Sequence, residues 1–387
     1  MQKIAIFGAT GTIGENALDV IRQHRDKFCV TTLIAEKNWH KLADQAKEFN
    51  PEYVGIANEK FLPQLRDALS GFKIKIVGGE AAINDLANEK FDLFLAAITG
   101  TKALIPTFNA IKSGAKIGMA NKECLVAAGQ LLLKEARKNG AEILPIDSEH
   151  NAIYQILEKQ NLDKISEIIL TASGGPFLYK NPEELQNITV EEAICHPNWR
   201  MGAKISVDSA TMMNKALEVI EAYHLFNLPP EKIKIVIHPQ SIIHGLVSYE
   251  DGATLAMMSE PDMKIPISHI LGLAKSGTRL KTNKPKLDLV KIAQFDFLAP
   301  NLERFPVLNL LTEILRIDQN FPCIFNAAGE VAVANFLAKK VAFNDIIKIT
   351  DQILEKSAPK TLNSLEEIIA CDIQTKKLTQ NLIDNDF

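Results

Sequence analysis

The sequence predicts an α/β protein with a doubly wound N-terminal domain, an α+β middle domain and a small helical C-terminal domain. Strand and helix patterns alternate from residue 1 to about residue 147, as in a parallel sheet with helices on both faces. A hairpin signal lies at residues 245–259, and only helical patterns follow residue 299. The length of 387 residues also favours two or three domains.

The composition narrows the class of protein. Hydrophobic residues make up 47% and charged residues 23%, an ordinary globular balance. The net charge of −4 offers no positive field for nucleic acid or an anionic membrane. There is no membrane-spanning apolar run and no signal-peptide pattern, and the five scattered cysteines form no C-x-x-C pair. We therefore expect a cytoplasmic protein without nucleic-acid or membrane partners.

The N-terminal domain begins with a strand at Lys3–Phe7 that runs into the glycine turn Gly8–Gly14 and then a helix. Such a turn lets the backbone approach a pyrophosphate, and the helix N-terminus supplies N–H donors. Its spacing is G-x-x-G-x-x-G rather than G-x-G-x-x-G, so a turn without a ligand is the alternative. Further strands are predicted at residues 29–35, 53–56, 73–77, 92–98, 116–119 and 142–146.

Two carboxylates, Asp147 and Glu149, lie where the last of these strands ends and a helix begins, with Ser148 as the predicted N-cap. This edge of an open α/β sheet is where ligands bind, and paired carboxylates suit Mg²⁺ or Mn²⁺. Taken alone, the segment Leu144–Asn151 favours the alternative, which is helix capping and a helix-dipole role. The triplet Asn121–Glu123 follows another strand and is either a helix start or a lysine directed at a substrate oxygen.

In the middle domain, a long irregular segment extends from about residue 173 to residue 203 and contains Ser173–Phe177 and His196–Gly202. Long loops inside compact domains are often lids, and Trp199 is a candidate for closing over a ligand. The alternative is a small local core around the tryptophan. A strand at 165–172 precedes this segment, and a short helix is predicted near 190–194.

Ser209, Asn214, Lys215 and Glu218 are predicted to share one helical sector. They suit a phosphate grip beside a further metal ligand, Glu218, whereas a solvated Lys–Glu face is the alternative. His238 and His244 are six residues apart, a spacing that allows a shared strand face, and are interpreted as structural rather than as zinc ligands. The predicted domains are 1–147, 148–272 and 299–387, joined by a linker at 273–298, with C-terminal helices at 307–315, 326–338, 344–355 and 365–369.

With these segments assembled, the chain resembles the 1-deoxy-D-xylulose 5-phosphate reductoisomerase family along essentially its whole length. The motifs that carry the resemblance are Gly8–Gly14, Ala120–Glu123, Asp147–Asn151, Ser173–Phe177, His196–Trp199, Lys204–Glu218 and Glu260–Met263.

The resemblance implies a Rossmann-like NADPH-binding domain and a homodimer formed through the sheet of the middle domain. The implied reaction is the isomerisation and NADPH-dependent reduction of 1-deoxy-D-xylulose 5-phosphate to 2-C-methyl-D-erythritol 4-phosphate, in isoprenoid biosynthesis. Asp147, Glu149 and Glu218 are implied to bind Mg²⁺ or Mn²⁺, with Co²⁺ as a further candidate. This reverses the preference for a capping role.

The resemblance also assigns residues to the substrate and the cofactor. The phosphorylated sugar is implied to contact Lys122, Ser148, Glu149, Ser173, His196, Trp199, Ser209, Asn214, Lys215 and Glu218. The residues implied to line the cofactor are Thr10, Gly11, Thr12, Ile13, Lys37, Asn38, Asn121, Glu123 and Gly202. The implied catalytic set is Lys122, Asp147, Glu149, His196 and Glu218.

One position departs from the family pattern, because Glu36 stands where a small residue is expected. An acid there usually binds a ribose 2′-OH and favours NAD, whereas Lys37 and Asn38 match contacts to a 2′-phosphate. We expect NADPH to be preferred. Two other functions stay open at this stage: another NAD(P)-dependent enzyme, such as a homoserine or semialdehyde dehydrogenase, and a non-enzymatic nucleotide sensor.

Overall fold

A computed structural model describes residues 1–197, 199, 202–275 and 277–387. Asn198, Arg200 and Met201 of the predicted lid therefore lie outside the described residues. The chain forms two compact units. Unit 1 comprises residues 1–124, 130–151 and 262–285, and unit 2 comprises residues 125–129, 152–261 and 286–387.

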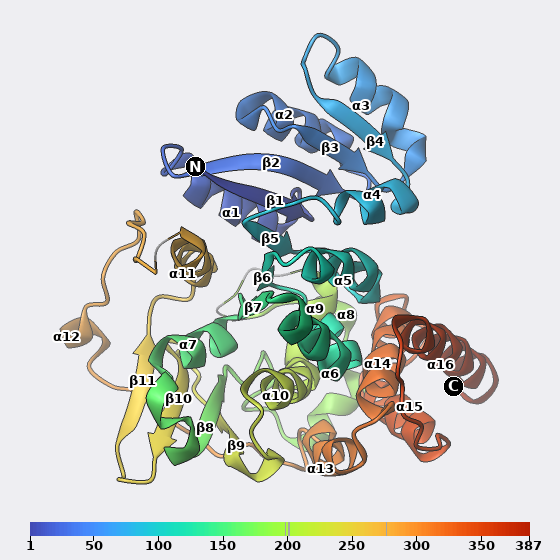
Figure 1. The fold of residues 1–387 in the computed structure, drawn as a ribbon. Helices are drawn as coiled ribbons and strands as arrows, with labels where there is room; N and C mark the ends of the chain where they lie inside the picture. Colours follow the sequence, from blue (N-terminus) through green and yellow to red (C-terminus); the bar gives the residue numbers. More distant parts are fainter. Residues whose placement is uncertain (198, 200–201, 276) are drawn as a thin grey trace. The chain divides into compact units, whose positions relative to one another are not determined.

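Unit 1 is built on a seven-stranded parallel sheet in the order β4-β3-β2-β1-β5-β6-β7 (Figure 1). Its central strands are buried on both faces, which explains their continuous apolar runs. The strands are β1 (Gln2–Phe7), β2 (Phe28–Ala35), β3 (Tyr53–Ile56), β4 (Lys75–Gly78), β5 (Leu93–Ala96), β6 (Lys116–Met119) and β7 (Glu142–Pro145).

Helices connect consecutive strands of this sheet, as parallel pairing requires. They are α1 (Thr12–Arg22), α2 (Trp39–Phe49), α3 (Leu62–Ala68), α4 (Glu80–Leu86), α5 (Leu104–Lys112) and α6 (Lys122–Asn139), with 3-10 turns η1 (Glu59–Phe61) and η2 (Thr101–Ala103). The first residues of α7 (Ser148–Ile156) also belong to this unit.

Helix α11 (Lys264–Lys275) returns to unit 1 from far along the chain and packs against α1. Lys264 Nζ lies 2.7 Å from Asp19 Oδ2, and His24 Nε2 lies 2.7 Å from the Lys281 carbonyl oxygen. The domain division predicted from the sequence stays a prediction, but residues 262–285 pack with the N-terminal sheet.

The turn after β1 requires glycine at Gly8. Its φ is +106°, and a Cβ there would lie 2.3 Å from the Ala97 carbonyl oxygen. We expect Gly8→Ala to lower the free energy of unfolding by more than about 2 kcal/mol, because backbone strain and a clash add. Gly71→Ala is the control, since Gly71 has φ +90° but a Cβ at that position would meet nothing within 4 Å. Urea unfolding measures the free energy of unfolding of both variants. Equal losses of stability would show that the clash with Ala97 is relieved at no cost in free energy.

Unit 2 contains a four-stranded mixed sheet in the order β11-β10-β8-β9. The predicted antiparallel hairpin is confirmed, while β8 and β9 pair in parallel. The strands are β8 (Ile165–Ala172), β9 (Ile233–Ile237), β10 (Ile243–Tyr249) and β11 (Thr254–Met258).

The helices of unit 2 enclose its hydrophobic core, which includes Phe305, Phe325, Leu170, Ile220 and Val207. They are α8 (Val190–Ala193), α9 (Ala203–Ala210), α10 (Met213–Phe226), α12 (Leu289–Ile292), α13 (Val307–Ile317), α14 (Phe321–Leu337), α15 (Asp345–Glu355) and α16 (Leu365–Asp386). Short 3-10 turns are η3 (Lys159–Lys164), η4 (Pro182–Asn187) and η5 (Pro230–Lys232).

One local prediction is wrong, and one spacing argument does not hold. Ser148 is the first helical residue of α7, and the Asp147 carbonyl accepts the Asn151 N–H at 2.8 Å, so Asp147 occupies the capping position instead. His238 and His244 do not share a strand, because His238 follows β9 and His244 belongs to β10. None of the helices among the described residues is long and apolar enough to cross a membrane.

Candidate active site

The junction between β7 and α7 concentrates charge in unit 1. Carboxylate oxygens of Asp147 and Glu149 lie within 4.8 Å of each other. Lys122, the first residue of α6, is buried and places Nζ 2.5 Å from Asp147 Oδ2. The Ser148 N–H donates to Asp147 Oδ1 at 3.0 Å, and the Ser148 hydroxyl donates to Glu149 Oε2 at 2.6 Å. The predicted residues Lys122, Asp147, Ser148 and Glu149 thus meet at one edge of the sheet.

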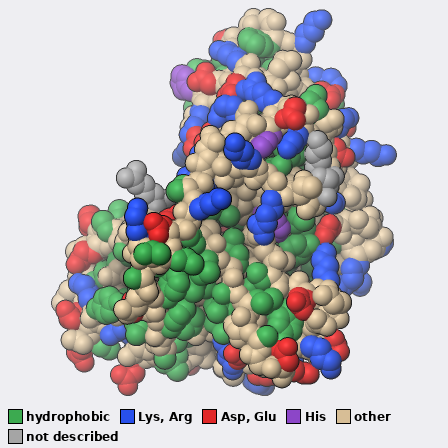
Figure 2. All heavy atoms as spheres, turned by 90° about the vertical axis from the view of Figure 1, so that its left-hand side faces the viewer, with side chains coloured by type: hydrophobic (Ala, Val, Ile, Leu, Met, Phe, Trp, Pro, Cys, Tyr) green, Lys and Arg blue, Asp and Glu red, His purple; other side chains and the backbone are tan. Residues whose placement is uncertain are grey.

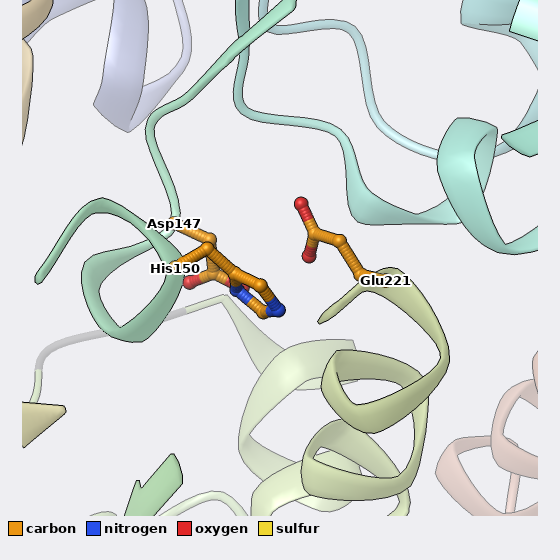
Figure 3. Close-up of side chains that lie close together, drawn as sticks. All are labelled: Asp147, His150 and Glu221. Carbon is orange, nitrogen blue, oxygen red and sulfur yellow. The ribbon is translucent and has the colours of Figure 1, made fainter. Parts of the chain in front are cut away.

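His150 is a further residue of this junction that the sequence did not single out. Its ring is fully buried, and Nδ1 lies 3.7 Å from Asp147 Oδ2. Figure 3 labels Asp147 and His150 at the start of α7 and, on α10, the buried Glu221. His150 and Glu221 are identified as candidate site residues by their buried polar side chains in the structure. The sequence pattern marks neither residue.

In unit 2, α10 carries a buried charged group near its start. Lys215 and Glu218 are 3% and 1% exposed, and the Lys215 ammonium pairs with Glu218 Oε2. Asn214 Nδ2 donates to the other carboxylate oxygen of Glu218. Burial excludes the predicted alternative of a solvated Lys–Glu face.

Ser209 lies on α9 rather than on the same helix as Asn214, which corrects the prediction of one continuous sector. Met212 separates the two helices with a left-handed φ of +61°. The loop after β8 packs against this break, since a Cβ on Gly175 would lie 3.0 Å from the Ser209 carbonyl oxygen. The break therefore brings the Ser173 loop, Ser209 and the start of α10 together in unit 2.

Ser173 and His196 form a defined hydrogen-bond pair. Ser173 Oγ lies 2.9 Å from His196 Nε2, and the Trp199 N–H donates to His196 Nδ1 at 3.0 Å. Because Nδ1 accepts, the neutral ring carries its proton on Nε2 and donates it to Ser173. Burial lowers the pKa of His196 to about 4, which keeps this neutral form at pH 7. Ser173 Oγ also accepts the Gly175 N–H at 3.1 Å, so its own proton remains available for a ligand.

Trp199 is half-buried, and its ring lies 6.4 Å from the His244 ring in an edge arrangement. His244 is itself fixed, because Ser259 Oγ lies 2.9 Å from its Nε2. The tryptophan thus lies against β10. This contact is compatible with both sequence interpretations of Trp199, a lid and a local core.

The glycine turn after β1 leads into α1 without a side-chain cap, and Gly11 occupies the capping position. The backbone N–H groups of the first turn, which include those of Thr12 and Ile13, are therefore available to an anion. Thr10 lies in the same turn and is half-buried. This arrangement suits the pyrophosphate of a dinucleotide.

Asn121 is 3% exposed and holds two loops at the carboxyl edge of the sheet. Its amide nitrogen donates to the carbonyls of Ile98 and Gly100, and its Oδ1 accepts the Cys124 N–H at 2.8 Å. Glu123 is half-buried in the first turn of α6. Gly202 caps α9 in unit 2, and a Cβ there would meet nothing within 4 Å.

The end of β2 carries the residues expected at the 2′-position of the cofactor. Glu36 and Lys37 are exposed, and Asn38 caps α2 by accepting the Lys41 N–H at 3.3 Å. The Lys41 ammonium pairs with Glu15. Lys102 Nζ lies 3.3 Å from Glu36 Oε1, a contact that the sequence pattern does not reveal because 66 residues separate the two.

Comparison with known families identifies this constellation. Residues 4–129 match 1-deoxy-D-xylulose 5-phosphate reductoisomerase, residues 143–226 match the C-terminal domain of that enzyme, and residues 258–378 match the DXP reductoisomerase C-terminal domain. The chain belongs to the 1-deoxy-D-xylulose 5-phosphate reductoisomerase family. It is therefore an oxidoreductase, and the family decides against the dehydrogenase and nucleotide-sensor alternatives.

Relatives of the same family name span the whole chain. The reductoisomerase of Zymomonas mobilis is 45% identical over 383 residues, covering 98% of both chains, and that of Chlorobium phaeobacteroides is 45% identical over 373 residues, covering 96% of this chain and 97% of the relative. A solved Zymomonas mobilis structure in complex with NADPH has a TM-score of 0.94 and 42% identity, covering 99% of each chain. A DOX-P reductoisomerase in complex with NADPH, fosmidomycin and magnesium has a TM-score of 0.92 and 40% identity, covering 99% of this chain and 98% of that one.

Proposed function

We propose that this chain performs the family's reaction with the residues described above. The reaction is the NADPH- and divalent-cation-dependent conversion of 1-deoxy-D-xylulose 5-phosphate to 2-C-methyl-D-erythritol 4-phosphate. The observation that carries the assignment of roles is the carboxylate pair at the β7–α7 junction, where Asp147 is already neutralised by Lys122. Oxidation of NADPH that requires both this substrate and Mg²⁺ tests the proposal.

Asp147, Glu149 and Glu218 are the proposed metal ligands. Their chemistry fits Mg²⁺ or Mn²⁺, which prefer carboxylate oxygens. A cation bound there supplies Lewis-acid polarisation of a substrate carbonyl. Asn214 and Lys215 fix the Glu218 carboxylate, and the Asp147 capping geometry fixes its own carboxylate, so both ligands are orientated before binding.

Lys122 and Ser148 are the proposed contacts to the polar backbone of the substrate. Both already touch the metal-binding carboxylates, so a substrate oxygen near the metal falls within their reach. Lys122 is 7% exposed, and its charge acts with little screening on an oxygen that becomes negative during the rearrangement.

The substrate phosphate is proposed to bind Ser173, Ser209, Asn214 and Lys215, with His196 beside it. The Ser173 hydroxyl proton is available because its oxygen accepts from His196 and Gly175. Lys215 contributes a buried positive charge. Neutral His196 orients the serine rather than supplying charge, and Trp199, held by His196, is the proposed lid residue.

NADPH is proposed to lie with its pyrophosphate on the first turn of α1 and its 2′-phosphate beside Lys37 and Asn38. The residues proposed to line it are Thr10, Gly11, Thr12, Ile13, Lys37, Asn38, Asn121, Glu123 and Gly202. The Asn121 amide donates hydrogen bonds to the Ile98 and Gly100 carbonyls. Asn121 is therefore proposed to hold the loops beside the cofactor rather than to bind it with its side chain.

We also propose a cytoplasmic location, since all five cysteines are free thiols.

We further propose a homodimer formed through the sheet of unit 2. Strand β11 is an edge strand with unpaired backbone groups. Figure 2 shows hydrophobic side chains gathered on the lower part of the face that carries it. The exposed apolar residues of β11 and of residues 289–298, which contain α12, are Leu255, Met258, Leu289, Val290, Phe297 and Leu298.

We expect the wild-type chain, of 42.8 kDa, to sediment at twice this mass at micromolar concentration. Leu255→Glu combined with Val290→Glu should give the monomer, because two charges enter an apolar contact. Ile373→Glu, at an exposed position of α16, is the control and should stay dimeric. A wild-type chain that sediments as a monomer would contradict the proposed interface.

A further inference from the structure

An acidic residue at the end of β2 would oppose binding of the 2′-phosphate of NADPH. Glu36 follows β2 directly, and β2 lies beside β1, whose end carries the glycine turn. In dinucleotide-binding sheets an acid at this place accepts a hydrogen bond from the ribose 2′-OH. A 2′-phosphate brings negative charge to the same place, and an uncompensated carboxylate would repel it.

Lys102 supplies the compensation from a different part of unit 1. Its Nζ lies 3.3 Å from Glu36 Oε1 and 4.0 Å from Glu80 Oε1. Lys102 belongs to η2 after β5, and β5 flanks β1 on the side opposite to β2. The lysine therefore reaches past the end of β1 to meet the acid.

The backbone that carries Lys102 is well fixed. Gly100 caps η2 with φ +72°, and its carbonyl accepts a hydrogen bond from buried Asn121 at 2.9 Å. The same Asn121 amide also donates to the Ile98 carbonyl. Asn121 thus ties the end of β6 to the turn that presents Lys102.

Lys102 lies close to two carboxylates at once, because ion pairs join it to both Glu36 and Glu80 among the described residues. Lys41 does not help, because its ammonium pairs with Glu15. Removal of Lys102 would take away the ammonium that faces both the Glu36 and the Glu80 carboxylates.

We propose that Lys102 is a specificity-determining residue that neutralises Glu36 and so permits the 2′-phosphate of NADPH to bind beside Lys37 and Asn38. The inference rests on the proposed placement of the cofactor. Glu36 and Lys102 are each about two-thirds exposed, so salt weakens the effect.

The test measures binding of 2′,5′-ADP and 5′-AMP by isothermal titration calorimetry, at low and at high salt. These probes differ only in the 2′-phosphate and need neither metal nor turnover. The variants are Lys102→Met, Glu36→Gln and the double variant. Lys112→Met is the matched control, because it removes the same charge from an exposed lysine at the other end of the same η2–α5 segment.

Lys102→Met is expected to weaken binding of 2′,5′-ADP about five- to tenfold at low salt, and binding of 5′-AMP less than about twofold. In the Glu36→Gln background the same change should cost less than about twofold, since the charge to be neutralised is gone. Lys112→Met should leave both probes unchanged.

Two results would overturn the inference while leaving the proposed cofactor site intact. An equal loss for 2′,5′-ADP in both backgrounds would mean that Lys102 contacts the phosphate directly. No loss on Lys102→Met would mean that the ion pair is irrelevant to binding. A wild-type chain that binds 5′-AMP as tightly as 2′,5′-ADP would instead overturn the placement of the cofactor, and this inference with it.

Discussion

Glu218→Gln is expected to raise the dissociation constant for Mn²⁺ at least about tenfold and to lower kcat about a hundredfold or more. The amide keeps the shape of the side chain but removes the charge that a hard cation prefers. It also leaves the buried Lys215 ammonium without its carboxylate partner on α10. Mn²⁺ titration and NADPH oxidation with the sugar phosphate measure the two effects.

Glu313→Gln, on the exposed face of α13, is the matched control and should bind Mn²⁺ and turn over as the wild type does. Treatment of the wild type with a strong chelator should abolish turnover, and Mg²⁺ or Mn²⁺ should restore it. Full activity after exhaustive chelation would contradict the proposed role of the carboxylates.

Ser173→Ala is expected to lower kcat/KM for the phosphorylated substrate about ten- to a hundredfold. The hydroxyl is orientated by His196 and Gly175 and is proposed to donate to the phosphate. With 1-deoxy-D-xylulose, which lacks the phosphate, the same change should have little effect. Lys215→Met should lower kcat/KM for the phosphorylated substrate further, because a buried charge is removed. It should also lower turnover of 1-deoxy-D-xylulose, because Lys215 fixes the Glu218 carboxylate.

The cycle of two substrates and two proteins isolates the phosphate contact. Ser357→Ala, just after α15, is a control that removes a serine hydroxyl which donates to the Ile353 carbonyl of that helix. Equal losses with both substrates would show that Ser173 does not touch the phosphate.

The sequence predicted the strands of unit 1 well because a parallel sheet buries both faces and gives continuous apolar runs. It placed β4 two residues too early at its start and made β5 too long, since strand ends carry weak signals. It missed the break at Met212, because a methionine in the left-handed region has no recognisable pattern. The break matters, because it turns one predicted helix face into two helices.

The predicted site residues fall into two classes. Asp147, Ser148 and Glu149 are adjacent in the chain, so their clustering at a strand end could be predicted from position alone. The partners Lys122 and Lys102 depend on which strands are neighbours, and the sequence does not state the strand order. The contact of His150 with Asp147 is local, since the two residues lie only three positions apart. The pairing of Glu36 with Lys102 is the clearest case, because it spans the end of β1 and resolves a conflict that the sequence left open.

The location of the bound cation tests the central proposal most directly. We predict that crystals grown with Mn²⁺ and NADPH will show one strong anomalous peak per chain, coordinated by carboxylate oxygens of Asp147, Glu149 and Glu218. The same experiment on Glu218→Gln should show a weak peak or none. A strong peak away from these three carboxylates, with none between them, would contradict the proposed site.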